Sequence, residues 1–263
     1  MKIYFASPEN TDFSALKLFG VKQFLFSYHF LRKLEKKELS KYLKSKDLFL
    51  DSGAFSAKTI GAEINLKEYI KFIQDYKIEN YASLDVIGNG PETLVNTNLM
   101  IKEGLKPIHT FHKGTAEDFL HKSLELDLDY IALGGMVGNK KNIYNWLDEV
   151  WKIIQKEKPN VKVHGFGCTS YELMTRYPWY SVDSTSWNSA RKFGTGFDCN
   201  GITLEKNQIL KNLKNELPLS FMDDGTLLLL QNVFSMMLLE SKIKKEDTVK
   251  NYDYLTIQKG LFE

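Results

Sequence analysis

The sequence predicts an α/β protein with a single (β/α)8 domain, a TIM barrel. Eight short apolar runs, rich in β-branched and aromatic residues, lie between residues 2 and 184, and amphipathic stretches separate most of them. Eight such units favour a closed barrel over a doubly wound open sheet, which is the main alternative. With 263 residues and 43% hydrophobic content, the chain is long enough to bury the core of one such domain.

The predicted strands are short runs bounded by charged or turn-forming residues. They are KIYFA (2–6), KQFLFS (22–27), DLFLD (47–51), NYASLDV (80–86), KPIHTFH (106–112), DYIALGG (129–135), VKVHGFG (161–167) and WYSVDS (179–184).

The predicted helices carry their apolar residues at helical spacing. In LKEYIKFIQDY (66–76) the apolar residues share one broad face, and Gly104 and Pro159 are expected to stop two later helices. The helical segments are 66–76, 92–104, 117–126, 142–157 and 225–243. We expect residues 1–190 to form the barrel core and residues 191–263 to form a C-terminal helical extension packed on it.

Composition excludes several classes of protein. A net charge of +2 does not indicate nucleic-acid binding by itself, although it leaves room for a local basic face. Cys168 and Cys199 form no CxxC pair, so neither a disulfide framework nor a cysteine-rich zinc site is predicted. The sequence has no signal peptide and no apolar run of about 18 residues. We therefore expect a soluble cytoplasmic protein without a membrane partner.

A barrel places its functional residues at the carboxyl ends of its strands. Those ends bring three acids, several histidines and two glycine pairs to one rim. The residues at the strand ends are, in chain order, Tyr28, His29, Asp51, Ser52, Asp85, His109, His112, Gly134, Gly135, Gly165, Gly167, Asp183 and Ser184.

Asp51 and Asp183 are the acids predicted to be catalytic. A pair of carboxylates suits chemistry at an anomeric carbon, where one attacks the sugar and the other transfers protons. The structural alternative is that an acid at a strand end only caps the next helix. Three acids on one rim, including Asp85, favour the catalytic interpretation.

LGGMVG (133–138) and Phe55 have the character of a binding site for a planar base. Two glycines let such a ligand lie against the backbone, and an aromatic ring can stack on it. The alternatives are a tight turn for the glycine pair and a core position for Phe55. The pattern is neither GxGxxG nor a Walker motif.

The histidines do not predict a metal site. His109 and His112 lie three residues apart in a strand and should point to opposite sides. His164 and His29 are expected to be structural, within reach of a rim carboxylate. We predict no metal and no cofactor.

Five motifs, between residues 22 and 191, resemble the tRNA-guanine transglycosylases in the same order. DSGAFSA (51–57) resembles their DSGGFQ motif, FSYHF (26–30) their NTYHL segment and LGGMVG their base-binding loop. HGFGCTS (164–170) is similar to their glycine-containing strand, and SVDSTSW (181–187) lies where they carry the nucleophile.

The resemblance implies that Asp183 is the nucleophile and Asp51 the general acid/base. Asp85 and the backbone of Gly134 and Gly135 would read the base, on which Phe55 would stack. It further implies base contacts from Ser52 and Met136, support from Tyr28, His29, His164 and Gly165, and phosphate contacts from Arg191 and Arg176, two of only three arginines.

The differences from the family's motifs bear on which nucleic acid is the substrate. The family's zinc subdomain, with its CxCxxC run, is absent, Ala54 replaces a glycine and Ser56 stands where glutamine is usual. Compact bacteriophage relatives, which insert 7-deazaguanines into DNA, are more similar. The expected partners are therefore DNA and a free 7-deazaguanine, with tRNA as the alternative and a homodimer left open. A glycosidase-like hydrolase and a non-catalytic nucleic-acid-binding barrel are the alternatives of another class.

Overall fold

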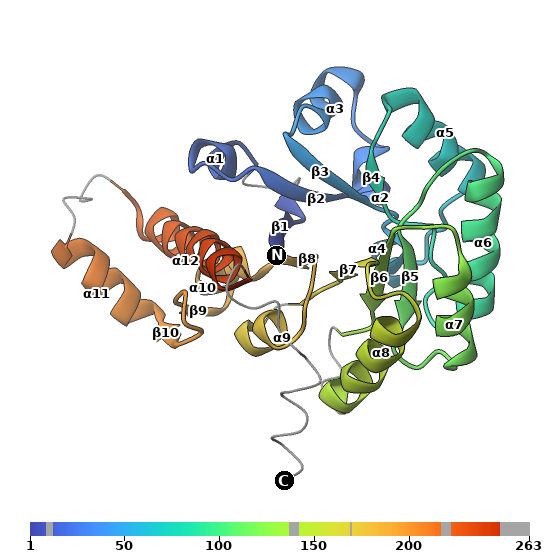
Figure 1. The fold of residues 1–263 in the computed structure, drawn as a ribbon. Helices are drawn as coiled ribbons and strands as arrows, with labels where there is room; N and C mark the ends of the chain where they lie inside the picture. Colours follow the sequence, from blue (N-terminus) through green and yellow to red (C-terminus); the bar gives the residue numbers. More distant parts are fainter. Residues whose placement is uncertain (9–12, 137–141, 169, 217–221, 248–263) are drawn as a thin grey trace, which may run out of the picture.

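A computed structural model describes residues 1–8, 13–136, 142–168, 170–216 and 222–247. It is a mixed α/β fold built on one all-parallel sheet of eight strands, in the order β4-β3-β2-β1-β8-β7-β6-β5 (Figure 1). The strands are β1 (Lys2–Ala6), β2 (Gln23–Ser27), β3 (Asp47–Asp51), β4 (Asn80–Tyr81), β5 (His109–His112), β6 (Tyr130–Gly134), β7 (Lys162–Gly165) and β8 (Ser181–Ser184). All eight predicted strands are present; most are shorter than predicted, and the fourth is shortened most.

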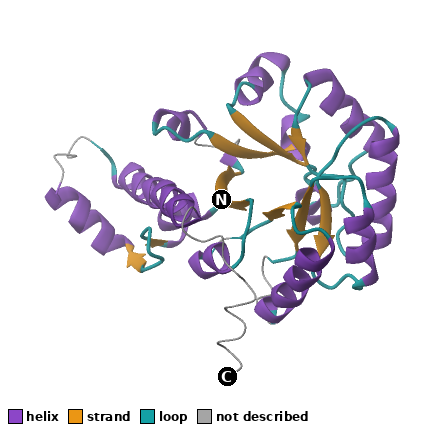
Figure 2. Cartoon of the chain, viewed as in Figure 1, coloured by secondary structure: helices purple, strands orange, loops and turns teal. Residues whose placement is uncertain are grey.

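Helices connect successive strands and lie outside the sheet (Figure 2). They are α1 (Phe13–Leu18), α2 (Tyr28–Leu31), α3 (Lys36–Leu43), α4 (Ala54–Thr59), α5 (Leu66–Tyr76), α6 (Gly90–Lys102), α7 (Asp118–Glu125), α8 (Ile143–Glu157), α9 (Tyr171–Arg176), the 3-10 helix η2 (Ser186–Asn188), α10 (Ser189–Phe193), α11 (Lys206–Glu216) and α12 (Asp224–Asp247). The five predicted helices correspond to α5, α6, α7, α8 and α12.

Local sequence explains where the longer helices begin and end. The side chain of Asn65 accepts hydrogen bonds from the first amides of α5, and Asn89 does the same for α6. Gly104 follows α6 with a φ of 79°, a conformation that glycine adopts without strain. α8 ends at Glu157, two residues before Pro159, as the sequence predicts.

The sheet is curled, and residues next to its two edge strands pair with each other. Ala82, next to β4, forms a parallel bridge with Ile108, next to β5. The amide of Ile108 donates to the carbonyl of Tyr81 at 2.8 Å, and the amide of Ser83 donates to Ile108 at 2.9 Å. A curled, all-parallel sheet with helices outside it is a TIM-like α/β arrangement.

Alternation along the strands divides the buried side chains into two sets. One set forms a cluster inside the curl: Tyr4, Ala6, Leu25, Phe49, Ala82, Ile108, Tyr130 and Ala132, with Phe166 packed against it. Their strand neighbours, such as Phe5, Phe24 and Leu50, belong to the larger cluster that packs under the helices. A residue's place in this alternation therefore shows whether its side chain faces the interior.

The chain beyond β8 adds the short η2 and α10, then a hairpin and two longer helices. β9 (Thr195–Phe197) pairs antiparallel with β10 (Thr203–Glu205), and α11 and α12 follow. α12 lies against β1 and η2, and its residues Val233, Met236 and Leu239 belong to the main core cluster. The helix therefore shares the core of the barrel-like sheet. A domain boundary at residue 190 stays a prediction.

None of the helices among the described residues is both long enough and apolar enough to traverse a bilayer.

Replacing Leu239 in α12 tests whether this helix belongs to the same folding unit as the sheet. Leu239 is fully buried, whereas the adjacent Leu238 is 57% exposed. We expect Leu239→Ala to lower the free energy of unfolding by about 2–5 kcal/mol, because it leaves a cavity in the core. Leu238→Ala, the matched control, should change it by less than about 0.5 kcal/mol. Urea unfolding measures both, and equal effects would show that α12 is not packed in this way.

Candidate active site

The turn after β3 holds the carboxylate of Asp51 in place. Asp51 is two residues beyond the interior Phe49, so its side chain faces the interior at the carboxyl end of the sheet. The amide of Gly53 donates to Asp51 Oδ2 at 3.0 Å. Gly53 has a φ of 77°, and a Cβ there would lie 2.3 Å from Ser27 Oγ and 2.6 Å from His29 Cβ. Only glycine fits, so the turn is pressed against the end of β2.

A hydrogen-bonded cluster around Asp85 joins the ends of three strands. Ser52 Oγ donates to Asp85 Oδ1 at 2.7 Å, and His112 Nε2 lies 3.2 Å from Asp85 Oδ2. The amide of Ala54 donates to Ser52 Oγ at 3.2 Å, which orients the hydroxyl. The residues after β3, after β4 and at the end of β5 are thereby locked together. A carboxylate held from two sides is suited to reading a ligand's N–H groups with its remaining lone pairs.

The buried side chain of Tyr69 is influenced by the charges of both Asp51 and Asp85. Its hydroxyl donates to the carbonyl of Ala82 at 2.8 Å. Burial, followed by the charges of Asp51 and Asp85, raises the pKa of Tyr69 well above its ordinary value. Tyr69 therefore stays protonated and donates to Ala82, and it did not stand out in the sequence.

Asp183 lies near the carboxyl end of β8 and is only 7% exposed. Its Oδ1 accepts from the backbone amide of Gly167 at 2.9 Å and lies 3.2 Å from His164 Nε2. His164 Nδ1 lies 2.6 Å from Ser181 Oγ, which in turn contacts the hydroxyl of Tyr130 at 2.5 Å. These contacts form one chain that runs from Asp183 down into the interior.

One assignment of hydrogens satisfies every member of this chain. Burial raises the pKa of Tyr130, so its hydroxyl keeps its proton and donates to Ser181. Ser181 then donates to His164 Nδ1, which leaves the proton of a neutral imidazole on Nε2 to donate to Asp183. In this assignment both Gly167 and His164 donate to Asp183 Oδ1.

Asp51 and Asp183 face the same interior from the same end. Asp51 pairs with Ser27 of β2, and Asp183 pairs with Tyr4 of β1, so two strands lie between their own. The strand pairing and the alternation of side chains along the strands are both consistent with the two acids lying on one rim.

Cys168 is not a nucleophile of this site. It is fully buried, and burial together with the charge of Asp183 raises the pKa of its thiol well above the ordinary value. A thiol in such surroundings stays protonated and inert.

The predicted glycines serve close packing. A Cβ at Gly134 would lie 2.7 Å from His112 Cδ2, so this glycine makes room for the imidazole that reaches Asp85. Gly135 has a φ of 80°, which favours glycine. A Cβ at Gly165 would lie 3.1 Å from the ring of Trp179. Contacts between these backbones and a base stay a prediction, and residues 137–138 of the motif lie outside the described residues, as does Thr169 of HGFGCTS.

The other predicted base-site residues differ in exposure. Phe55 on α4 is 64% exposed, which leaves its ring available for stacking. Met136 is buried within the main core cluster, and Tyr28 packs against Tyr69 with ring centroids 4.8 Å apart. His29 is buried beside Gly53, and burial, together with Lys33 and Arg32, lowers its pKa.

The two arginines predicted to contact phosphate occupy different ends of the sheet. Arg191 lies on α10, just after β8, and donates to Asn188 Oδ1 at 2.8 Å. Arg176 ends α9, which leads back to the amino end of β8, and it pairs with Asp148 at 3.0 Å. The fold therefore keeps Arg191 on the side of Asp183 and places Arg176 on the other side.

His109 and His112 point in opposite directions, as predicted. His109 Nδ1 lies 2.7 Å from Thr97 Oγ1 on α6, whereas His112 turns inward to Asp85. Among the described residues, no group of three or more His, Cys, Asp or Glu side chains could hold a metal.

Two cavities lie beside this rim. One, of about 600 Å³, is bordered by α4, the residues after β4 and α6, and Asp85 lines it. The other, of about 630 Å³, lies over the ends of β5 and β6 beside Gly135. Both volumes are in the range of small-ligand sites. Asp51 and Asp183 line neither of them.

Comparison with known sequences does not assign a function to the protein. Neither the protein-family models nor the curated proteins contain a match to the chain.

His109 predicts a stability change in mild acid. Burial, and then the neighbouring His112, lower its pKa from 6.5 to about 4, while Asp85 acts in the opposite direction. Between those pH values the unfolded chain binds the proton more readily, so stability is lost as pH falls from 6.5 towards 4. The shift corresponds to at most about 3 kcal/mol.

The control variant His109→Gln cannot bind this proton and keeps a partner for Thr97. We expect the difference in unfolding free energy between the native protein and this variant to shrink as pH falls. Urea titrations at several pH values would measure it, and a difference that does not vary with pH would contradict the assignment.

Proposed function

We propose that the protein is a base-exchange enzyme that replaces guanine in DNA by a 7-deazaguanine through a covalent aspartyl-sugar intermediate. The observation that carries this proposal is the interior placement of Asp51 and Asp183 at one end of the sheet, with the Asp85 cluster beside Asp51. The order of the five motifs, which resembles the tRNA-guanine transglycosylases, supports it independently.

The first half of the reaction breaks the bond between guanine and the sugar. Asp183 Oδ attacks C1′ and forms a C1′–O bond, while the C1′–N9 bond breaks and its electron pair leaves with guanine. Asp51, acting as an acid, supplies the proton that guanine takes up. His164 and Gly167 hold Asp183 in one orientation for this attack.

The second half reverses these steps with a different base. Asp51, now a carboxylate, removes the N9 proton of the incoming 7-deazaguanine, and N9 attacks C1′ as the C1′–O bond to Asp183 breaks. Two inversions retain the β configuration of the nucleoside. No oxidant, reductant or cofactor enters this balance.

Asp85 is the group proposed to read the base. Guanines and 7-deazaguanines share an edge of N–H donors, which a carboxylate accepts. Ser52 and His112 orient Asp85 from opposite sides, and the adjoining cavity leaves its surroundings accessible. The exposed ring of Phe55, four residues after Asp51, is placed to stack on such a base.

DNA is the proposed polymer because the chain lacks the Cys-rich zinc run of the tRNA enzymes and resembles their compact bacteriophage relatives. The target guanine must be flipped out or met in a single strand, since duplex DNA hides C1′ and the base edge. Arg191 and rim lysines would contact phosphates. Such an enzyme would act in the cytoplasm, that of the host if it is viral.

We also propose that the fold is a closed (β/α)8 barrel formed by residues 1–190 and extended by residues 191–263. The parallel bridge between Ala82 and Ile108 supports closure, because it joins the two edge strands of the sheet. The continuous interior cluster supports it as well.

Replacing the nucleophile tests the proposal directly. The native protein should incorporate radiolabelled 7-deazaguanine into guanine-containing DNA, and Asp183→Asn should reduce the rate by roughly a thousandfold or more. Asp47→Asn is the matched control, because Asp47 lies on β3 at the opposite end of the sheet. Circular dichroism should show that both variants are folded.

The same assay separates the alternatives. Label entering tRNA instead of DNA would change the polymer and keep the chemistry. Abasic sites that form without a base acceptor would indicate a hydrolase. Incorporation by Asp183→Asn at the native rate would refute the assignment, and no incorporation into either polymer by the native protein would favour a non-catalytic barrel.

Replacing Asp85 tests the base-reading role separately. Asp85→Asn removes the charge but keeps an oxygen for Ser52, so we expect the KM for 7-deazaguanine to rise about 10- to 100-fold. Because Asp85 does not bond to the sugar in the proposed reaction, kcat at saturating base should change much less. Initial rates at varied base concentration distinguish the two constants. A fall in kcat alone, with KM unchanged, would remove Asp85 from base recognition.

A further inference from the structure

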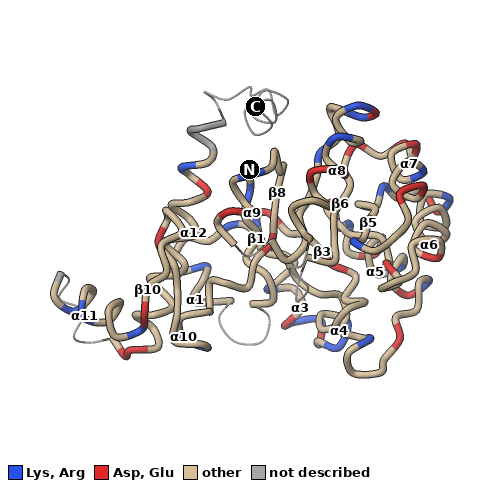
Figure 3. Tube along the Cα trace, turned by 90° about the horizontal axis from the view of Figure 1, so that it is seen from below, with Lys and Arg blue, Asp and Glu red and all other residues tan. Residues whose placement is uncertain are grey.

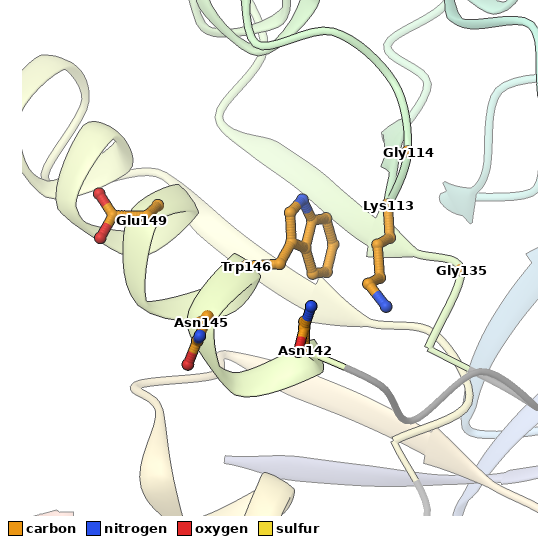
Figure 4. A pocket seen from close by; sticks show the side chains of 7 residues that line it. All are labelled: Lys113, Gly114, Gly135, Asn142, Asn145, Trp146 and Glu149. Atoms are coloured by element: carbon orange, nitrogen blue, oxygen red, sulfur yellow. The ribbon is translucent and has the colours of Figure 1, made fainter.

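The cavity over the ends of β5 and β6 contains a half-buried tryptophan. Its lining comes from the residues after β5 and β6 and from the first two turns of α8 (Figure 4). These residues are Lys113, Gly114, Gly135, Asn142, Asn145, Trp146 and Glu149. The sequence did not single out any of them except Gly135.

The walls of this cavity are continuous with the candidate active site. The amide of Lys113 donates to the carbonyl of Gly134 at 3.0 Å, and a Cβ at Gly135 would lie 3.1 Å from Lys113 N. The two rim segments are therefore packed tightly together. His112 turns inward to Asp85, and the next residue, Lys113, lines the cavity. The Asp85 cluster and the cavity are therefore joined through two consecutive residues of the chain.

Trp146 presents an aromatic face to the cavity. Phe111 lies nearly parallel to it, with an interplanar angle of 20° and centroids 6.3 Å apart, and Trp146 is among the residues that line the cavity. In Figure 4 the indole ring lies above the side chain of Asn142, with the side chain of Lys113 beside both. The other three tryptophans are at most 4% exposed, so Trp146 alone combines an indole ring with access.

The polar groups around the ring match a nucleotide. Lys113 brings a cation, and the exposed Asn142 and Asn145 bring amides that both donate and accept hydrogen bonds. The carboxylate of Glu149 is paired with Lys152 at 2.8 Å, which reduces its repulsion of an anion. A stacking ring, a cation and paired donors and acceptors are the elements of single-strand recognition.

We propose that this cavity binds an unpaired nucleotide of the nucleic-acid strand, beside the nucleotide whose base is exchanged. Its base stacks on Trp146 and its phosphate contacts Lys113. The inference rests on the proposed function, because it makes the strand that enters the active site the ligand. Holding a neighbouring nucleotide outside the interior would help keep the target nucleotide flipped towards Asp183.

Binding of a strand without guanine tests this site apart from the exchange reaction. The probe is a fluorescently labelled single-stranded ten-nucleotide oligothymidylate, followed by anisotropy. Trp146→Leu should weaken its binding about tenfold or more, since stacking on an aromatic ring contributes that much per base. Trp146→Tyr, which keeps an aromatic face, should bind nearly as tightly as the native protein.

Two further readouts locate the contact. The unlabelled oligothymidylate should quench the tryptophan fluorescence of the native protein, and the quench should vanish in Trp146→Leu. Lys113→Gln should lower the slope of log K against log salt by about 0.7, the loss of one phosphate contact.

Tyr76→Leu is the matched control. Tyr76 is an exposed aromatic residue that lines a cavity at the amino ends of the strands, together with Lys2 and Lys77. It should bind the oligonucleotide as the native protein does.

Equal binding by the native protein, Trp146→Leu and Trp146→Tyr would overturn the proposal, as would an equal loss in Tyr76→Leu. Free thymidine monophosphate that quenches at the same concentration as the oligonucleotide would also overturn it, because the site would then bind a free nucleotide. Loss of exchange in Asp183→Asn with unchanged binding by Trp146→Leu would refute this site alone. Oligonucleotide binding that depends on Trp146 without any exchange by the native protein would refute the enzyme and keep the strand-binding site.

Discussion

The buried carboxylate of Asp183 is the constraint around which the interior is arranged. A carboxylate that is 7% exposed is costly unless donors replace the water it has lost. The amide of Gly167 donates to it and His164 Nε2 lies within hydrogen-bond distance, and His164 contacts Ser181, which contacts Tyr130. The interior therefore holds a polar chain among apolar rings, and removing one member would leave the next one unpaired.

Much of this arrangement could be predicted from the sequence. The eight strands were predictable because short apolar runs recur at regular spacing, and Asp51 and Asp183 because each lies at a strand's carboxyl end. The short helices α1, α2, α4, α9 and α10 were not, since six or fewer residues provide too little periodicity, and α3 and α11 were missed as well. The contact of His112 with Asp85 was also hidden, because strand alternation predicts which side of the sheet a residue faces and not which side chain it meets there.

The charge distribution gives the protein no strong overall electrostatic field, so a nucleic-acid strand, if it is the ligand as proposed, would have to be held by local contacts. Lys and Arg are interspersed with Asp and Glu around the outer helices (Figure 3), and the net charge is +2. Such a surface attracts nucleic acid weakly over distance. Binding would then depend on short-range contacts at the rim, which is where Phe55 and Trp146 expose aromatic faces.

The interior also decides from which side a ligand arrives. Tyr4, Phe49 and His164 form an aromatic layer beneath Asp183, with ring centroids 4.6–6.1 Å apart. Below it, Tyr4 donates to Asp47, which also pairs with Lys2. This layer fills the interior on the amino side of Asp183, so in the proposed reaction a nucleotide would have to reach Asp183 across the carboxyl rim. A strand bound in that way would pass the ends of β5 and β6, where the cavity of Trp146 lies.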